Sequence, residues 1–262
     1  MPFKPLLFFV VLFSFSCNDT AIVRNKITSH QNIAATGADK NLFHSINTIP
    51  LPDGYVRIPA DSNSFACWLR TVALKENKTV YLFNGTPKIN QLAQFAVLDI
   101  SVANKDLQQC ADAVMRLRAE YLFAAKQYDA IVFTDNDNTV YTFHPPYSKE
   151  NFMHYLETVF GMCGSASLAK QLKPVTDFST IEPGDVLIHG GFPGHAEIVM
   201  DVASNAAGKK IFMLAQSYMP AQDIHVLVNP ASESLSPWYE VNDDKKIITP
   251  EYLFHQNELK RW

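Results

Sequence analysis

Three side chains, Cys110, His195 and Gln216, have the residue types of an acyl-transfer site and follow one another in that order along the chain. Such a site needs a sulfur nucleophile, an imidazole that exchanges protons with it, and a polar group that holds the imidazole in one tautomer. Cys110 lies in the first turn of a predicted helix, where the helix dipole favours a negatively charged sulfur. We therefore assign Cys110 as nucleophile, His195 as proton carrier and Gln216 as orienting group.

Two neighbouring strands would bring His195 and Gln216 together. The segments 195–203 and 208–217 are rich in apolar and β-branched residues, and a four-residue loop joins them. If the residues that flank this loop pair with each other, His195 lies directly opposite Gln216, and opposed side chains project to the same side of a sheet. A slip of one residue would separate them. The predicted register also places on that side Glu197, Val199 and Asp201.

Two helices stand out in the rest of the pattern. The first, predicted over 106–128, begins at Asp106 as N-cap with Gln109 at the capping-box spacing. Its apolar residues recur at steps of three and four, so they share one face with Cys110. The second covers 148–162, with Ser148 as its cap. A shorter segment, 63–74, suits a short helix or an irregular anchor.

Strand-like segments surround these helices. They are short, rich in β-branched and aromatic residues and bounded by turn residues, and they cover 78–85, 94–102, 130–134, 139–143, 184–190, 195–203, 208–217 and 223–230. The last four follow one another without an intervening helix. A helical first half docked on such a run predicts an α+β fold with an antiparallel sheet.

The N-terminus has the features of a targeting segment. Residues 1–17 combine Lys4, a ten-residue apolar run and Cys17, which is too short to span a bilayer and suits a signal peptide. Polar, unpatterned residues at 18–49 suit a tether, and 50–262 would form a single folded domain. The net charge of −4 and the lack of a dense basic run argue against nucleic acid as a partner.

Several motifs resemble known families. "LFSFSC" resembles a bacterial lipoprotein signal in which Cys17 is lipidated; simple secretion is the alternative. "PGDVLIHGG" followed by "GHAEIVM" resembles the NlpC and CHAP types of cell-wall amidohydrolase. That resemblance implies a papain-like core in which an N-terminal cysteine-bearing helix packs on an antiparallel sheet. It also implies that His195 is catalytic and that Gln216 stands at the place of the third residue.

A second resemblance covers most of the chain from Leu51 onward. "DLQQCADAVMRLRAEYLF", "GDVLIHGGFPGHAEIVMDVA" and "LAQSYMPAQDIHVLVNP" are similar to an uncharacterised family of bacterial envelope lipoproteins with a domain of unknown function. The chain departs from the cell-wall enzymes at the cysteine, where "QQCADA" lacks the Ser and Gly that usually follow. The 85 residues between Cys110 and His195 also exceed the separation in those compact enzymes.

The remaining polar residues leave alternatives open. Gln108 or Gln109 could donate to an oxyanion, and Ser217 and Tyr218 could form either a satisfied turn or one wall of a cleft. The spacing of His189, His195 and His225 is not that of a zinc site, so we expect no metal and no cofactor. Cys67 and Cys163 would be structural residues, and a disulfide bond between them is one possible arrangement.

Together these features predict an envelope cysteine peptidase or amidase, attached to a membrane through its lipid and acting on peptides of the cell wall. The alternative is a non-catalytic lipoprotein that uses the same cleft to bind a peptide, glycan or lipid, because a fold alone does not decide function.

Overall fold

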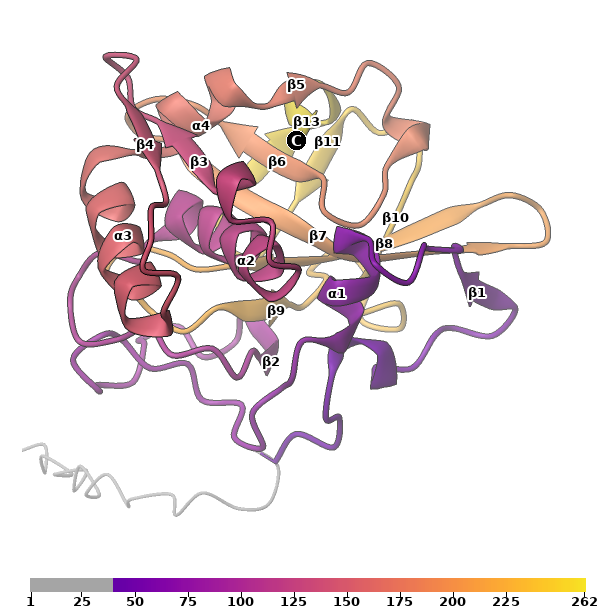
Figure 1. The fold of residues 1–262 in the computed structure, drawn as a ribbon. Helices are drawn as coiled ribbons and strands as arrows, with labels where there is room; N and C mark the ends of the chain where they lie inside the picture. Colours follow the sequence, from indigo (N-terminus) through magenta and orange to yellow (C-terminus); the bar gives the residue numbers. More distant parts are fainter. Residues whose placement is uncertain (1–39) are drawn as a thin grey trace, which may run out of the picture. The chain divides into compact units, whose positions relative to one another are not determined.

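A nine-stranded antiparallel sheet dominates the computed structural model, which describes residues 40–262 (Figure 1). Its main path runs β2-β9-β8-β7-β6-β13-β5; β1 also pairs with β7, and β10 with β8. The strands of this sheet are β1 (Tyr55–Arg57), β2 (Gln94–Val97), β5 (Lys173–Pro174), β6 (Val186–His189), β7 (His195–Asn205), β8 (Lys210–Gln216), β9 (His225–Leu227), β10 (Trp238–Glu240) and β13 (Leu259–Arg261). Two hairpins stand apart from it: β3 (Val132–Thr134) with β4 (Val140–Thr142), and β11 (Lys246–Ile248) with β12 (Leu253–His255).

Helices are spread along the chain between these strands. The α-helices are α1 (Phe65–Thr71), α2 (Cys110–Ala124), α3 (Lys149–Met162) and α4 (Ser165–Gln171), and short 3-10 turns occur at η2 (Ile46–Thr48), η3 (Tyr128–Ala130), η4 (Phe178–Thr180) and η5 (Gln256–Glu258). Both α1 and α2 pack against β7, α3 packs against α2, and α4 contacts β3 and β6. The long central strand β7 is therefore the common support of the first two helices.

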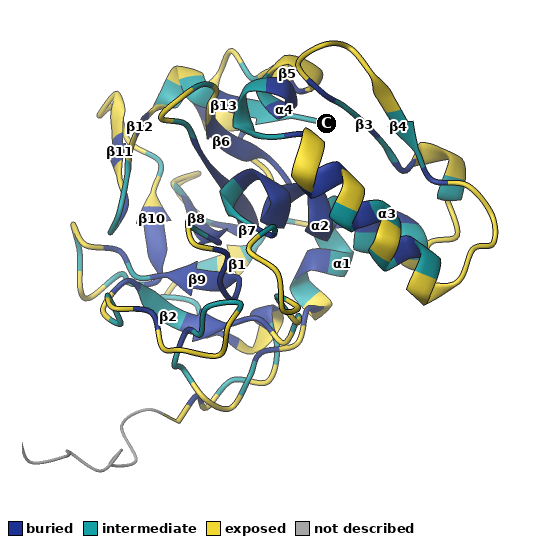
Figure 2. Cartoon of the chain, turned by 90° about the vertical axis from the view of Figure 1, so that its left-hand side faces the viewer, coloured by how far each residue is buried: buried dark blue, intermediate teal, exposed yellow. Residues whose placement is uncertain are grey.

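Apolar residues fill both faces of the sheet, as the buried central strands in Figure 2 show. On the helical face, Ile198 and Ala215 join a core with Val114 and Leu117 of α2. On the other face, Val199 and Leu214 pack with residues that include Phe254 of β12. Because successive side chains of a strand point to opposite faces, β7 contributes to both cores and reads as an almost continuous buried run.

The prediction of a papain-like core with an N-terminal cysteine-bearing helix is wrong. The protein is a mixed α+β fold dominated by antiparallel sheet, and β1, α1 and β2 precede the helix that carries Cys110. Moreover, β1 and β2 belong to the same sheet as the C-terminal strands, pairing with β7 and β9. Periodicity indicated a helix at this place but carried no information on which distant strands pair, so the topology was not accessible to it.

The boundaries of the elements also differ from the sequence pattern. Helix α2 begins at Cys110 rather than 106, because Asp112 accepts a hydrogen bond from the Gln109 N–H at 2.9 Å and Asp106 instead binds the Ala221 N–H at 2.7 Å. The predicted strand 78–85 forms only isolated bridges, since the chain reverses at Asn84–Gly85. In contrast, the cap of α3 is confirmed: Ser148 Oγ accepts from Asn151 N–H at 3.1 Å.

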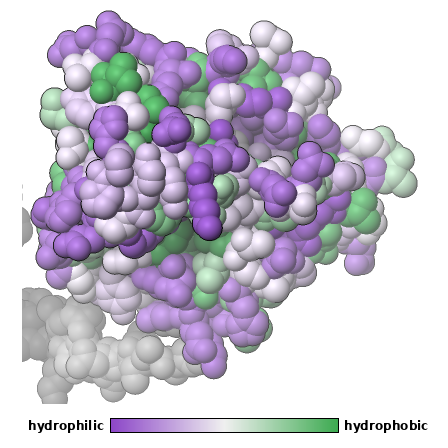
Figure 3. All heavy atoms as spheres, in the orientation of Figure 1, coloured by the Kyte–Doolittle hydropathy of each residue, from purple (hydrophilic) through white to green (hydrophobic). Residues whose placement is uncertain are grey.

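The predicted signal peptide 1–17, its Cys17 and most of the predicted tether 18–49 lie outside the described residues. Within that tether, Ile46 and Ile49 are fully buried in the core. Across residues 40–262 no helix has the length and apolar content needed to span a membrane. The face drawn in Figure 3 is mostly hydrophilic, with apolar side chains scattered over it.

Candidate active site

A glycine-rich loop between β6 and β7 positions His195. A Cβ at Gly194 would lie 2.2 Å from Ser165 Oγ, and one at Gly190 would lie 2.8 Å from the Cβ of Ala169. Both contacts are with α4, so these glycines allow the loop to press against that helix. Ser165 Oγ also donates to the Gly191 carbonyl at 3.3 Å. The loop therefore fixes the point at which β7 begins.

His195 itself is buried and surrounded by rings. Only 2% of the residue is exposed. Its ring centroid lies 4.9 Å from that of Tyr218 and 4.9 Å from that of Tyr252, and 5.9 Å from that of Phe254. Its Nε2 atom donates to Gln216 Oε1 at 2.7 Å. The two residues predicted to interact are thus in direct contact.

The register that led to this prediction is nevertheless wrong. Near the loop Ser204 pairs with Lys210, and the pairing shifts at a bulge between Val199 and Asp201. Beyond the bulge Ile198 pairs with Ala215, so the next step places Glu197, not His195, across from Gln216. His195 reaches Gln216 as a diagonal neighbour, a distance that long side chains span. The bulge also moves Asp201 away from the side that carries Glu197.

A hydrogen-bond network fixes the orientation of Gln216. Its Nε2 donates to Glu251 Oε2 at 2.7 Å and lies 3.3 Å from His225 Nε2. The other ring nitrogen of His225 donates to the Asp223 carbonyl at 2.9 Å, which leaves Nε2 as an acceptor. With the amide nitrogen of Gln216 held this way, its oxygen must face His195. Nε2 of His195 therefore carries a proton, and Nδ1 is free for a second partner.

Glu251 anchors this network. It forms an ion pair with Lys88, and its Oε1 accepts from Asn90 Nδ2 at 3.0 Å. Burial alone would raise the pKa of Glu251, but hydrogen bonding and charge from Lys88 lower it overall. Burial lowers the pKa of Lys88 and lowers that of His225 to about 3, with the Lys88 charge as the second cause for His225. His225 is consequently a neutral histidine at neutral pH.

Cys110 is the first residue of α2 and is partly exposed beside the buried imidazole. Burial would lower the pKa of His195, but the interactions with Cys110 and Glu197 outweigh it and raise the pKa to about 10. Since Nε2 faces Gln216, Nδ1 is the nitrogen available to the sulfur. Among the described residues, the side chain of His195 makes a well-aligned hydrogen bond to Gln216 but none to Cys110. In cysteine–histidine pairs this hydrogen bond is often long or poorly aligned until substrate binds.

Glu197, which the predicted register places on the same side of the sheet as Gln216, is a further residue of the site. It is fully buried, its Oε1 accepts from Thr249 Oγ1 at 2.8 Å, and the same oxygen lies 3.6 Å from His195 Nε2. Within residues 40–262 its Oε2 has no hydrogen-bond partner. Burial raises the pKa of Glu197, although His195 acts in the opposite direction. This carboxyl group is the second polar neighbour of the imidazole.

The other predicted residues are divided between the site and its support. Tyr218 is half-buried against His195 and forms a wall of the site. Ser217 is a satisfied buried residue whose Oγ lies 3.1 Å from the Gln108 carbonyl and 2.9 Å from that of Gln222. The amide of Gln109 donates to Asp106 at 3.1 Å. Gln108 is buried, with an Nε2 that has no partner among the described residues.

The structure also describes the cysteines and histidines outside the catalytic assignment. Cys67, Cys110 and Cys163 are all free thiols, so the bond suggested between Cys67 and Cys163 is absent from the described part of the chain. Burial and two nearby carboxyl groups raise the pKa of Cys163 to about 11. His189 pairs with Glu258 at 2.5 Å. No three His, Cys, Asp or Glu side chains in 40–262 are grouped to hold a metal ion.

Sequence reasoning missed Glu251, Lys88, Thr249 and Tyr252. They lie in connecting segments around β2 and between β11 and β12, far from the three site residues along the chain. No periodic pattern or motif marks them, because their roles depend on the folding of the C-terminal hairpin over the start of β7 and the end of β8.

Comparison with known proteins supplies a family but no activity. The family model described as "Domain of unknown function (4846)" matches residues 46–145 and 134–261. Searches of curated proteins and of solved structures found no match. The matched segments include Cys110, His195 and Gln216 and cover most of the chain. The chain therefore belongs to the family of domain of unknown function 4846.

Proposed function

We propose that this protein hydrolyses an amide bond by a cysteine mechanism, with Cys110 as nucleophile, His195 as proton carrier and Gln216 as the group that orients His195. One observation carries the proposal: a buried imidazole interacts both with a partly exposed thiol, Cys110, and with an amide oxygen that a further network holds in place. A core histidine with only a packing role has no need for a partner fixed on one nitrogen and a thiol that interacts with its ring.

Protonation favours this chemistry. A pKa near 10 for His195 means that both ring nitrogens of this imidazole carry a proton at neutral pH. In cysteine enzymes the anionic sulfur is the reactive form, and a protonated imidazole beside it favours that form. The proton on Nδ1 is then available to a leaving group near the sulfur.

The reaction balances with these groups and water. Cys110 Sγ attacks the carbonyl carbon, and a C–S bond forms. The C–N bond breaks as the leaving nitrogen takes the proton from His195 Nδ1, and a thioester remains on the enzyme. Water then attacks the thioester while Nδ1 accepts its proton, the C–S bond breaks, and the released acid leaves the enzyme in its starting state. No cofactor takes part.

The first turn of α2 would stabilise the charge that develops on the carbonyl oxygen. The backbone N–H of Cys110 is at the start of the helix, where amides lack intrahelical acceptors. Gln108 Nε2 is a second donor without a partner in residues 40–262, two positions before the nucleophile. Gln109 is less suited to this role, because Asp106 already accepts from its amide.

Peptides of the cell wall are the substrates to test first. The support is the likeness of residues 1–17 to a lipoprotein signal, which suggests a cell-envelope location with the membrane as a partner, together with the short patterns shared with NlpC and CHAP amidohydrolases. Tyr218 and Tyr252 flank His195 with partly exposed rings, a surface suited to the apolar parts of a peptide.

The test uses the purified full chain, a digest of peptidoglycan and water enriched in ¹⁸O. We expect fragments that carry one ¹⁸O in a new carboxyl group, and a thioester trapped by hydroxylamine at Cys110. Cys110→Ala should abolish both, whereas the control Cys67→Ala, at another partly exposed thiol, should retain both. Equal product from the wild-type protein and Cys110→Ala would disprove the mechanism, and binding of a fragment without cleavage would support a non-catalytic role.

A further inference from the structure

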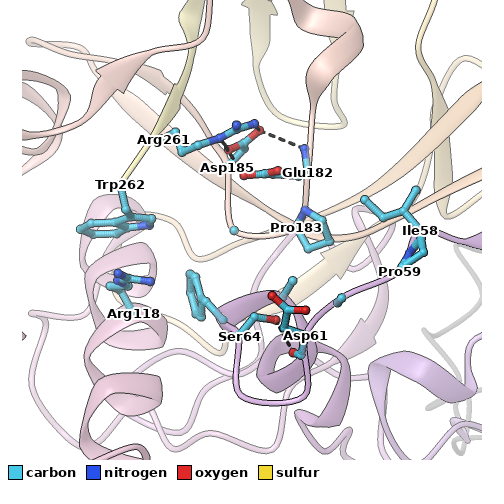
Figure 4. A pocket seen from close by; sticks show the side chains of 14 residues that line it. Ile58, Pro59, Asp61, Ser64, Arg118, Glu182, Pro183, Asp185, Arg261 and Trp262 are labelled. Carbon is cyan, nitrogen blue, oxygen red and sulfur yellow. Dashed lines mark hydrogen bonds and ion pairs between the residues drawn. The ribbon is translucent and has the colours of Figure 1, made fainter. Parts of the chain in front are cut away.

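A cavity of about 550 Å³ lies apart from the candidate active site, between α2, the segment before α1 and the start of β6 (Figure 4). Its lining includes Arg118, Asp61, Glu182, Asp185, Arg261 and Trp262, and none of the three proposed catalytic residues. Cavities of this size hold small organic ligands. Its charges indicate which ligand it suits.

Arg118 is a half-buried cation without an anionic partner. Its guanidinium lies 5.1 Å from the ring centre of Phe65, 5.4 Å from that of Tyr121 and 5.4 Å from that of Trp262. Burial lowers its pKa. No hydrogen-bond acceptor or carboxylate contacts it among the described residues, although a guanidinium has five donors. The aromatic rings hold this charge in place and leave its donors unused.

The other arginine of the cavity contrasts with Arg118. Arg261 binds Asp185 through two hydrogen bonds, of 2.6 and 2.8 Å, and its Nε lies 3.0 Å from Glu182. Figure 4 shows this paired group on one wall, with Arg118 beside Trp262 on another. Because Arg261 is satisfied by its partners, it forms a fixed wall rather than a receptor for an anion.

Asp61 supplies a second unpaired charge, of opposite sign. Its carboxylate makes no hydrogen bond or ion pair within residues 40–262, and it does not contact Arg118. In Figure 4 Asp61 comes from the segment before α1, whereas Arg118 comes from α2. Apolar residues complete the lining, among them Ile58, Pro59, Phe65 and Pro183. One cavity thus presents a free cation, a free anion and an apolar surface.

We propose that this cavity binds a short zwitterionic peptide, with its carboxylate on Arg118, its ammonium on Asp61 and an apolar side chain against Phe65 and Pro183. A guanidinium suits a carboxylate because both are planar and can share two hydrogen bonds. A simple anion would leave Asp61 as a repulsive neighbour, and a simple amine would leave Arg118 without a partner. The proposal does not depend on the hydrolase activity.

Calorimetric titration with the dipeptide Ala-Phe tests the proposal on the full chain carrying Cys110→Ala, which removes any turnover. We expect one binding site, and weaker binding by about tenfold or more when the ligand is N-acetylated or amidated at its carboxyl end, since each loses one charged contact. Asp61→Asn should weaken Ala-Phe binding by a similar factor and leave the affinity for N-acetyl-Ala-Phe unchanged.

Arg118→Gln should abolish the preference for a free carboxylate. Because Arg118 also packs on three rings, the melting temperature of the Arg118→Gln variant must be compared with that of the parent protein. Asp61 is exposed, so Asp61→Asn tests the proposal without this concern. Absence of binding at millimolar Ala-Phe would overturn the proposal. Binding that neither Asp61→Asn nor the blocked ligands weaken would also overturn it, because the ligand would then lie elsewhere.

Discussion

Strand β7 carries two buried carboxylates that the fold treats in opposite ways. Asp201 is fully buried, and Arg57 and Arg70 bind its two oxygens at 2.6 and 2.7 Å. Glu197, four residues earlier and equally buried, has no arginine or lysine partner: one oxygen faces Thr249 and His195, and the other has no partner among the described residues. Each oxygen of Asp201 therefore has a cationic partner, whereas Glu197, beside His195, keeps one oxygen without a hydrogen-bond partner in residues 40–262.

The bulge between Val199 and Asp201 separates the two regions. It turns Asp201 toward the face of α1, which supplies Arg70, while Glu197 shares the opposite face with Gln216 and the segment around Thr249. Buried ion pairs with full hydrogen bonding hold a fold together once formed, whereas unpaired buried groups occur at functional sites. By this comparison the part of β7 around Asp201 stabilises the fold, and the part around Glu197 carries the histidine of the proposed function.

The largest effect should come from Asp201→Ala. This change leaves Arg57 and Arg70 half-buried without their shared anion, and loss of one partner of a buried ion pair costs about 3–5 kcal/mol. Urea unfolding would measure the loss in free energy of unfolding. Glu197→Gln should cost clearly less; a larger loss for Glu197→Gln would reverse the comparison.

The next effect concerns pH and His225. Its pKa is lowered to about 3 by burial and by Lys88, so between about pH 6.5 and pH 3 the unfolded chain binds a proton that the folded chain does not. The free energy of unfolding should fall in that window as the pH decreases, by about 3 kcal/mol at pH 4. The difference between wild type and His225→Gln, measured at pH 7 and pH 4, isolates this share. A pH-independent difference would show that His225 titrates normally.

A smaller effect is expected for Gln216→Ala. The change removes the donor to Glu251 and the acceptor for His195, and an unpaired buried polar group costs about 1–3 kcal/mol. It should also slow any reaction of Cys110, because His195 is no longer held in one tautomer. Thermal unfolding combined with hydrolysis of the substrate separates the two effects. Reduced stability with unchanged hydrolysis would leave Gln216 a purely structural residue.

The smallest effect should be that of Ser148→Ala. It removes the cap of α3, which costs about 1 kcal/mol, at a place remote from both ends of β7. Urea unfolding should show this loss, and the reaction of Cys110 should be unchanged. A change in Cys110 chemistry would mean that the site depends on general stability rather than on its own network.

Local patterns predicted the parts of the site that depend on neighbouring residues. Propensity and spacing predict the turn before His195, strands at 195–203 and 208–217, a helix with Cys110 in its first turn and the cap at Ser148. The structure has all four, with β7 at 195–205, β8 at 210–216 and a helix that begins at Cys110 itself. The contact between His195 and Gln216 was predicted through a wrong register, and it forms because the amide reaches a diagonal neighbour. Because long polar side chains can reach a diagonal neighbour, the contact between the two residues was predicted correctly although the strand register was not.

The rest depends on contacts between distant segments. The bulge in β7, the pairing of β1 and β2 with the central sheet, and the support of Gln216 by Glu251 have no signature in periodicity. Hydrophobic alternation determines which face of a strand is buried, but it does not determine the strand beside it. The papain-like topology was therefore inferred from short motifs, and the antiparallel sheet of nine strands corrects it.

Alkylation of Cys110 by iodoacetamide at neutral pH, followed by peptide mass spectrometry, tests most directly whether Cys110 and His195 act as a pair. Cys67, a partly exposed thiol, and Cys163, whose pKa is raised to about 11, serve as internal references. We expect Cys110 to react faster than both, and His195→Ala to slow it by about tenfold or more while leaving Cys67 unaffected. A rate at Cys110 no higher than that at Cys67, and unchanged in His195→Ala, would contradict the assignment of Cys110 as nucleophile.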